Sequence, residues 1–163
     1  MHKNELEKYL RQINKDLYRF SYCLLPDSLQ VSQVIIDSIT VLLLERRELV
    51  ETLEFCSNEL EKRDTLFSIK LFLHKKIFEL IKKRTTQLTG SIEITPEFSE
   101  YYGLELIEKA VLYFKTKSDF EFEDIAFIIS ENRTAIFQAL ANGRNNLATR
   151  AGLTTLESSQ EAL

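Results

Sequence analysis

The sequence predicts an all-α protein made of two small helical domains that are joined by a linker. Apolar residues recur at three- and four-residue steps along several long segments, which is the period of an amphipathic helix. Four glycines and two prolines in 163 residues are too few for the many turns of a β-sandwich or barrel. Residues 87–103 interrupt the helical pattern with Thr, Ser, Gly and Pro, which is typical of a connection between domains.

The first predicted domain covers residues 1–86 and contains three strong helices. Residues 4–25 form the first, because their apolar positions line one face: Leu6, Tyr9, Leu10, Ile13, Leu17 and Phe20. Pro26 stops this helix, and Asp27 or Ser28 caps a second one that runs to about Arg47. The apolar surface of the second helix is wide, which indicates a central position. Residues 48–63 predict a short helix followed by a loop, and a third strong helix covers Asp64 to Arg84.

The second predicted domain covers residues 104–155 and also contains three helices. Their sequences are LELIEKAVLYFKTK, FEFEDIAFII and RTAIFQALANGRNNLATRAG, the last ended by Gly143 or by Gly152. Residues 156–163 are polar, and we expect a flexible tail there. The stretch from Phe120 to Leu147 has the order of a helix-turn-helix, with the polar break SEN between its two helices.

The charge of the chain is split unevenly between these domains. Residues 1–86 carry 15 Lys and Arg against 13 Asp and Glu, a net charge of +2, whereas residues 87–163 carry 6 against 12, a net charge of −6. An acidic half-chain repels a phosphate backbone unless its few cations are well placed. The second helix of the helix-turn-helix has no Lys or Arg between Thr134 and Asn142, which argues against simple DNA binding by this element.

Composition also bounds the location and chemistry of the protein. The charged first residues do not form a signal peptide, and the longest apolar run, Ile39 to Leu44, is too short for a bilayer. Cys23 and Cys56 are isolated, as in the reduced thiols of a cytoplasmic protein. Only His2 and His74 offer an imidazole base, and no glycine-rich phosphate loop or metal-ligand pattern occurs. We therefore expect that the protein is not an enzyme and has no catalytic residue. We also expect no metal, no cofactor and no membrane association.

Two segments carry candidate DNA contacts. The basic side of the third helix offers five side chains that can neutralise phosphates: His74, Lys75, Lys82, Lys83 and Arg84. A solvated helix face is the alternative interpretation of this set. The helix-turn-helix offers a smaller polar set, whose Gln and Asn side chains can read adenine: Arg133, Gln138, Asn142, Arg144 and Asn145. Phe137 either completes a small core or contacts a protein partner.

The order of these segments resembles that of the extracytoplasmic-function sigma factors of bacterial RNA polymerase. LYRFSYCLLPDSLQVSQVIIDSITVLLLERR (17–47) is similar to the first two helices of the family, and LFSIKLFLHKKIFELIKKR (66–84) to the third. FEFEDIAFIISEN (120–132) and GRNNL (143–147) match its helix-turn-helix. The resemblance implies a sigma region-2-like domain at 1–86, a linker at 87–103 and a sigma region-4-like domain at 104–155.

The resemblance also implies partners. Gln33, Ile36, Asp37 and Thr40 occupy the positions with which the family binds core RNA polymerase, and the third helix is assigned to promoter DNA. Three departures weaken the implied promoter recognition. Ser130 stands where the family has a turn glycine, and the recognition helix lacks basic residues. Phe55 is the only aromatic residue in the segment 50–65, where the family captures a promoter base.

Three hypotheses follow from the sequence. The first is a divergent sigma-like protein that binds core polymerase and directs or modulates initiation, with a possible anti-sigma or regulatory partner. The second is a degenerate sigma-like interaction module, such as a decoy or regulator of a sigma factor, without promoter recognition. The third is an unrelated helical bundle. Polymerase binding separates the first from the others, and DNA binding at low salt separates the first from the second.

Overall fold

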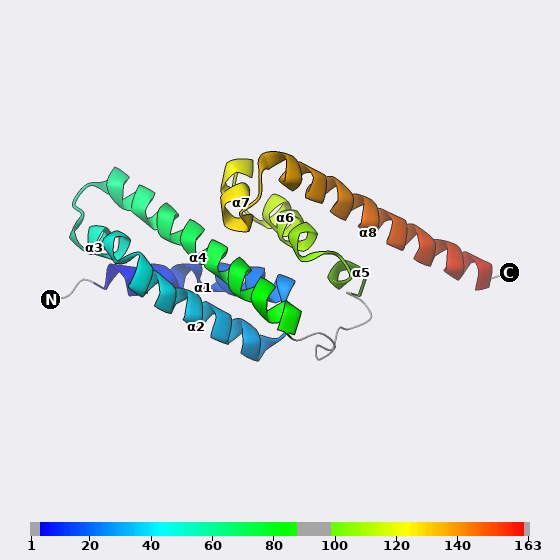
Figure 1. Cartoon of the computed structure of the whole chain (residues 1–163), viewed down its shortest axis with the longest axis horizontal. Coiled ribbons are helices and arrows are strands. Elements are labelled where there is room, and N and C mark those ends of the chain that lie inside the picture. Colours follow the sequence, from blue (N-terminus) through cyan, green and yellow to red (C-terminus); the bar gives the residue numbers. More distant parts are fainter. Residues whose placement is uncertain (1–3, 88–98, 162–163) are drawn as a thin grey trace. The chain divides into compact units, whose positions relative to one another are not determined.

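The computed structural model describes residues 4–87 and 99–161, and all regular elements in these ranges are α-helices (Figure 1). The predicted all-α fold class is therefore confirmed. The chain divides into two compact units, Met1–Gly90 and Ser91–Leu163, which we call unit 1 and unit 2. Most of the expected linker, residues 88–98, lies outside the described residues. Its end, Ser99–Tyr102, forms the short helix α5.

Unit 1 is built from four helices. They are α1 (Glu5–Leu24), α2 (Ser28–Glu45), α3 (Arg47–Phe55) and α4 (Glu59–Gln87). The helix α2 packs against both α1 and α4, and the short α3 packs against α4 and α1. Fully buried side chains fill the space between the helices: Leu17, Phe20, Leu24, Leu42, Leu53, Ile69, Leu73, Ile77 and Ile81. Burial of this apolar surface is the main source of stability of the unit.

The helix boundaries of unit 1 follow from capping side chains. Asp27 caps α2, because its carboxylate accepts a hydrogen bond from the backbone N–H of Gln30 at 3.0 Å. Asn58 acts in the same way before α4, accepting from the N–H of Leu60 at 2.9 Å. This cap explains why α4 begins at Glu59, five residues before the predicted start at Asp64.

Unit 2 contains α5 and three further helices. These are α6 (Leu106–Lys117), α7 (Phe122–Ile129) and α8 (Arg133–Glu161). The helix α8 packs against α5, α6 and α7, so it is the central element of the unit. Its apolar contacts come from buried side chains on three helices: Ala110, Val111, Phe114, Ile125, Ile128, Ile136 and Leu140.

The expected end of the last helix at Gly143 or Gly152 is wrong, because α8 continues through both residues to Glu161. Gly143 is a packing residue. A Cβ atom at this position would lie 3.0 Å from Leu112 Cδ1 and 3.4 Å from Glu108 Cβ, so the glycine lets α8 approach α6 closely. The predicted flexible tail from residue 156 is likewise helical as far as Glu161.

The helix α2 is long and apolar enough to cross a membrane by length and composition, with a mean hydropathy of 1.3 over Ser28–Glu45. A core helix of a soluble protein meets the same criterion. In unit 1 one side of α2 packs against α1 and α4, while several of its leucine and isoleucine side chains remain exposed. The exposed apolar side is therefore the feature of α2 that needs explanation.

Candidate functional site

The four side chains predicted to contact polymerase all lie toward solvent on α2. Gln33 and Thr40 are exposed, Ile36 is 57 % exposed and Asp37 is half-buried. Leu29 and Leu43, both exposed, precede and follow Ile36 by seven residues each. Residues spaced by three, four and seven positions share one helix face. Leu29, Gln33, Ile36, Thr40 and Leu43 therefore form one continuous stripe, which we call the α2 seam.

A polar group borders the α2 seam on the side of α4. Gln33 Nε2 donates to Asp37 Oδ1 at 2.9 Å, and Arg84 Nη2 donates to Asp37 Oδ2 at 2.7 Å. Arg84 also donates from Nη1 to Gln30 Oε1 at 2.6 Å. A groove of about 490 Å³ lies here between α2 and α4, lined by Gln30, Asp37, Leu80, Lys83, Arg84 and Gln87. Arg84, which the sequence assigned to DNA, is thus held beside the α2 seam by Asp37.

His74 is not a surface residue, and its predicted phosphate contact is therefore corrected. Its side chain is only 3 % exposed and packs against the ring of Phe20, with 5.2 Å between the ring centroids. Its Nδ1–H donates to the carbonyl of Lys70 at 2.8 Å. Burial lowers the pKa of His74 to about 4, so the imidazole is neutral at neutral pH.

The remaining predicted cations of α4 differ in their surroundings. Lys75 is half-buried and lies 3.8 Å from the carboxylate of Glu79, so part of its charge is compensated. Lys82 and Lys83 are exposed near the end of the helix. These two lysines are the predicted DNA contacts of α4 that are best presented to a phosphate backbone.

The turn between α3 and α4 presents two large apolar side chains. Phe55, the last residue of α3, is 86 % exposed, and Leu60 in the first turn of α4 is 65 % exposed. The sequence singled out Phe55 as the only aromatic residue of this segment, and the structure places it at the surface. Leu60 was not predicted, because its apolar character alone does not distinguish a surface position from a core position.

In unit 2, α7 and α8 are joined by a three-residue break as the helix-turn-helix pattern predicts. Ser130 ends α7 with φ 61° and ψ 40°, the left-handed conformation that glycine adopts most readily. Asn132 precedes α8, and its side-chain oxygen accepts a hydrogen bond from the N–H of Ala135 at 2.8 Å. The turn therefore forms with Ser130 at the position where the family has a glycine.

The predicted DNA contacts of α8 are all exposed, but they separate into two rows. Gln138, Asn142 and Asn145 follow each other at four and three residues and share one face. Arg133 and Arg144 lie on the adjacent face, together with Phe137. The guanidinium of Arg133 is engaged, because its Nη1 lies 3.1 Å from Glu123 Oε1. The amide row can therefore meet base edges, but few cations accompany it.

Phe137 is 43 % exposed and belongs to an aromatic cluster. Its ring lies 4.2 Å from that of Phe122, the first residue of α7, measured between centroids. Arg133 lies over the ring of Phe137 at 5.4 Å, and Lys115 lies over that of Phe122 at 4.2 Å. The ring of Phe137 thus packs within the unit while part of it remains exposed, and its contact with a protein partner stays a prediction. Lys115 and Phe122 were not predicted, because they come from two other helices.

Within residues 4–87 and 99–161, no group of three or more His, Cys, Asp or Glu side chains is arranged to hold a metal ion. Cys23 and Cys56 are not joined in a disulfide.

No family model matches this sequence, and no curated protein matches it. One solved structure is similar: the sigma factor RpoE in complex with the anti-sigma factor NepR from Bartonella quintana. The TM-score is 0.58, the sequence identity is 16 %, and the match covers 89 % of this chain and 95 % of that one. The chain thus has a sigma-factor-like helical fold.

Proposed function

We propose that the protein is a sigma-like factor that binds core RNA polymerase through the α2 seam and directs or modulates transcription initiation. The observation that carries this proposal is the exposed seam, at positions where the resemblance expects polymerase contacts. The sigma-like fold supports it, because the match extends over most of the chain.

The α2 seam has the spacing of a helix that docks onto other helices. Leu29, Ile36 and Leu43 repeat every seven residues, with Gln33 and Thr40 between them. Such a pattern lets apolar side chains pack into the spaces of a facing coiled coil, while polar positions set the register. The Asp37–Arg84 pair at 2.7 Å fixes a carboxylate at the edge of this surface, where it can orient a basic partner.

Promoter contact is assigned to two places at opposite ends of α4. These are the C-terminal end of α4 and the turn between α3 and α4, which precedes its first residue. Lys82 and Lys83 supply exposed positive charge, and Phe55 supplies an exposed ring on which a nucleobase can stack. The second unit contributes weakly, through the amide row of α8. This division follows the charge split between the two halves of the chain.

A binding assay with purified core polymerase tests the proposal. Ile36→Glu places a charge in the middle of the α2 seam and should weaken binding at least tenfold, about 1.4 kcal/mol, because the carboxylate must lose its water on docking. Leu60→Glu removes a similarly exposed aliphatic side chain elsewhere on unit 1 and should leave binding unchanged. Failure of the unmodified protein to bind polymerase would refute the proposal.

Charge reversal of Asp37 is a second test. Asp37→Lys should weaken polymerase binding, but it also places a lysine against Arg84. The paired change Asp37→Arg with Arg84→Asp keeps an ion pair and reverses its direction. If the polymerase recognises the negative charge at position 37, both Asp37→Lys and the paired variant should bind polymerase weakly. The paired variant should still be as stable as the parent.

The alternative function, a sigma-like interaction module without promoter recognition, is favoured by the aromatic cluster on unit 2. The similar sigma factor is bound to an anti-sigma factor, which supports a regulatory protein as partner. An exposed aromatic ring flanked by cations is a typical protein contact. If this alternative holds, the protein binds no DNA at low salt and Phe137→Ala weakens capture of the regulatory protein, whereas Phe127→Ala, a similarly exposed phenylalanine on α7, does not.

A further inference from the structure

The groove between α2 and α4 contains hydrogen-bond donors that the proposed function does not use. Its volume of about 490 Å³ lies within the range of small-molecule sites, which is about 300–1,000 Å³. The lining residues come from α2 and from the last turns of α4: Gln30, Asp37, Leu80, Lys83, Arg84 and Gln87. Five of these six residues are polar or charged, so the groove can recognise a ligand by hydrogen bonding.

Arg84 is the recessed cation of this groove. Its side chain is 21 % exposed, and it donates from Nη1 to Gln30 Oε1 at 2.6 Å and from Nη2 to Asp37 Oδ2 at 2.7 Å. A guanidinium has five N–H donors, and two of them are used in these bonds to described residues. Because two oxygen atoms hold the guanidinium in place, its remaining donors are fixed before a ligand arrives.

The other polar atoms of the groove also favour a ligand that is rich in acceptors. The side-chain carbonyl of Gln30 accepts from Arg84, which leaves the NH₂ group of this glutamine to donate. Lys83 is exposed and forms no ion pair with a described residue. Asp37 is the acidic residue of the lining, and its two oxygens already accept from Gln33 and from Arg84. The negative charge of Asp37 is therefore compensated, and the charge of Lys83 is left for a ligand.

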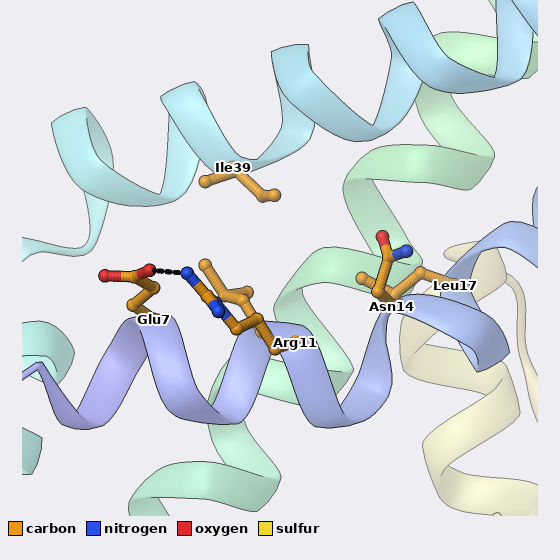
Figure 2. Close-up of a pocket in the computed structure, with 6 residues that line it drawn as sticks. Glu7, Arg11, Asn14, Leu17 and Ile39 are labelled. Carbon is orange, nitrogen blue, oxygen red and sulfur yellow. Dashed lines mark hydrogen bonds and ion pairs between the residues drawn. The ribbon is translucent and has the colours of Figure 1, made fainter.

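A second hollow on unit 1 lacks this character. It lies between α1 and α2 and has a volume of about 300 Å³. Its cation, Arg11, pairs with Glu7 of the preceding turn, as Figure 2 shows, and the side chain of Arg11 is 79 % exposed. Half of its lining is apolar: Leu10, Leu17 and Ile39. We therefore expect a charged ligand in the groove between α2 and α4 and not in this second hollow.

We propose that the groove between α2 and α4 binds a small phosphorylated molecule, whose phosphate oxygens accept hydrogen bonds from Lys83 and Arg84. An ionised phosphate presents several acceptors and no donor, so it matches a lining of donors. The guanidinium fork can pair with two phosphate oxygens at once, and the ammonium adds a second charge. A phosphate of duplex DNA fits less well, because Arg84 is recessed between two helices, whereas Lys82 and Lys83 are exposed at the surface.

Isothermal titration calorimetry of the full chain with inorganic pyrophosphate at low salt tests the proposal. Pyrophosphate has neither base nor sugar, so it measures recognition of phosphate alone, and we expect saturable binding at one site per chain. Lys83→Gln should weaken binding at least tenfold, because a charge-assisted contact is lost. Lys82→Gln is the matched control. It removes the same charge from the neighbouring exposed lysine, which does not line the groove, and it should bind pyrophosphate as the parent does.

Arg84 provides a test that charge alone cannot pass. Arg84→Lys keeps the positive charge but loses the fork, so it should bind pyrophosphate at least tenfold more weakly than the parent. Urea unfolding first establishes that each variant is folded, and if Arg84→Lys is not, Lys83→Gln alone decides.

Three results would overturn the proposal. They are no binding of pyrophosphate to the parent, equal losses in Lys82→Gln and Lys83→Gln, and binding of a short DNA duplex by a parent chain that does not bind pyrophosphate. The titration with pyrophosphate contains neither polymerase nor DNA, so failure of this proposal and failure of the proposed function can be told apart.

Discussion

His74 makes the stability of unit 1 depend on pH. Burial lowers its pKa to about 4 in the folded chain, against about 6.5 for an ordinary histidine. Between these values the unfolded chain takes up a proton that the folded chain does not. The contribution of the neutral imidazole is therefore complete above pH 6.5 and is lost as the pH falls toward 4. At pH 5 the expected loss is about 2 kcal/mol.

The measurement is the free energy of unfolding of unit 1 in urea at pH 7.5 and at pH 5. His74→Phe keeps a ring against Phe20 and removes the titrating group, so its stability should change less between the two pH values. Equal pH dependence of the variant and the parent would show that carboxylates, and not His74, cause the loss in acid.

Ser130 is the residue at which a single substitution should stabilise unit 2. Its φ of 61° places a non-glycine residue in the left-handed region, which costs about 1 kcal/mol. Ser130→Gly should therefore raise the free energy of unfolding of unit 2 by about 0.5–1 kcal/mol. Ser118, which ends α6 with a φ of −132°, is the matched control. Ser118→Gly should destabilise, and stabilisation by both substitutions would contradict the argument from backbone conformation.

At the scale of elements, Gly143 lies within α8 and allows this helix to pack closely against α6. It does not end the helix before a loop. Because a Cβ atom here would lie 3.0 Å from Leu112, a branched side chain cannot enter without displacing α6. Gly143→Val should lower the free energy of unfolding of unit 2 by about 1–3 kcal/mol. Asn142→Val at the exposed neighbouring position changes helix propensity little, because Asn and Val have similar propensities, and it should change stability much less.

The presence of the long helices was predictable from the sequence, because the spacing of their apolar residues indicates which face of each helix is buried. Helix ends were less predictable. Gly143 or Gly152 was expected to end α8, but at Gly143 the sequence signal of a glycine that permits close packing is the same as that of a glycine that caps a helix. The early start of α4 depends on Asn58, whose cap is visible only once the backbone N–H of Leu60 is placed against it.

The candidate surfaces were predictable to different degrees. The outward position of Gln33, Ile36 and Thr40 agrees with the sequence, because their spacing places them on one helix face. The burial of His74 was missed, since its lysine neighbours in sequence point away from the core. The contact of Arg84 with Asp37 joins residues 47 positions apart and has no local sequence signal.

At the scale of the whole molecule, charge is distributed unevenly between the two halves of the chain. Residues 1–86 have a net charge of +2 and include the exposed lysines of α4, whereas residues 87–163 have a net charge of −6. A helix-turn-helix in an acidic unit can present the shape of a DNA reader without the phosphate contacts that fix its register. We therefore expect the acidic surroundings to weaken contact of the amide row of α8 with DNA, even though its side chains have suitable chemistry.

Adding positive charge to α8 tests whether the missing cations are what weakens DNA recognition by unit 2. Thr134 and Ala141 are exposed and lie between the two rows of α8. Thr134→Arg with Ala141→Arg should raise affinity for duplex DNA at low salt and steepen the salt slope by about 1.8, because two more phosphates are neutralised. The same two arginines at Ser32 on α2 and Thr116 on α6, both exposed and outside the proposed DNA contacts, control for a general effect of net charge. An unchanged affinity of the α8 variant would mean that this helix does not face DNA, and the interaction-module alternative would then be favoured.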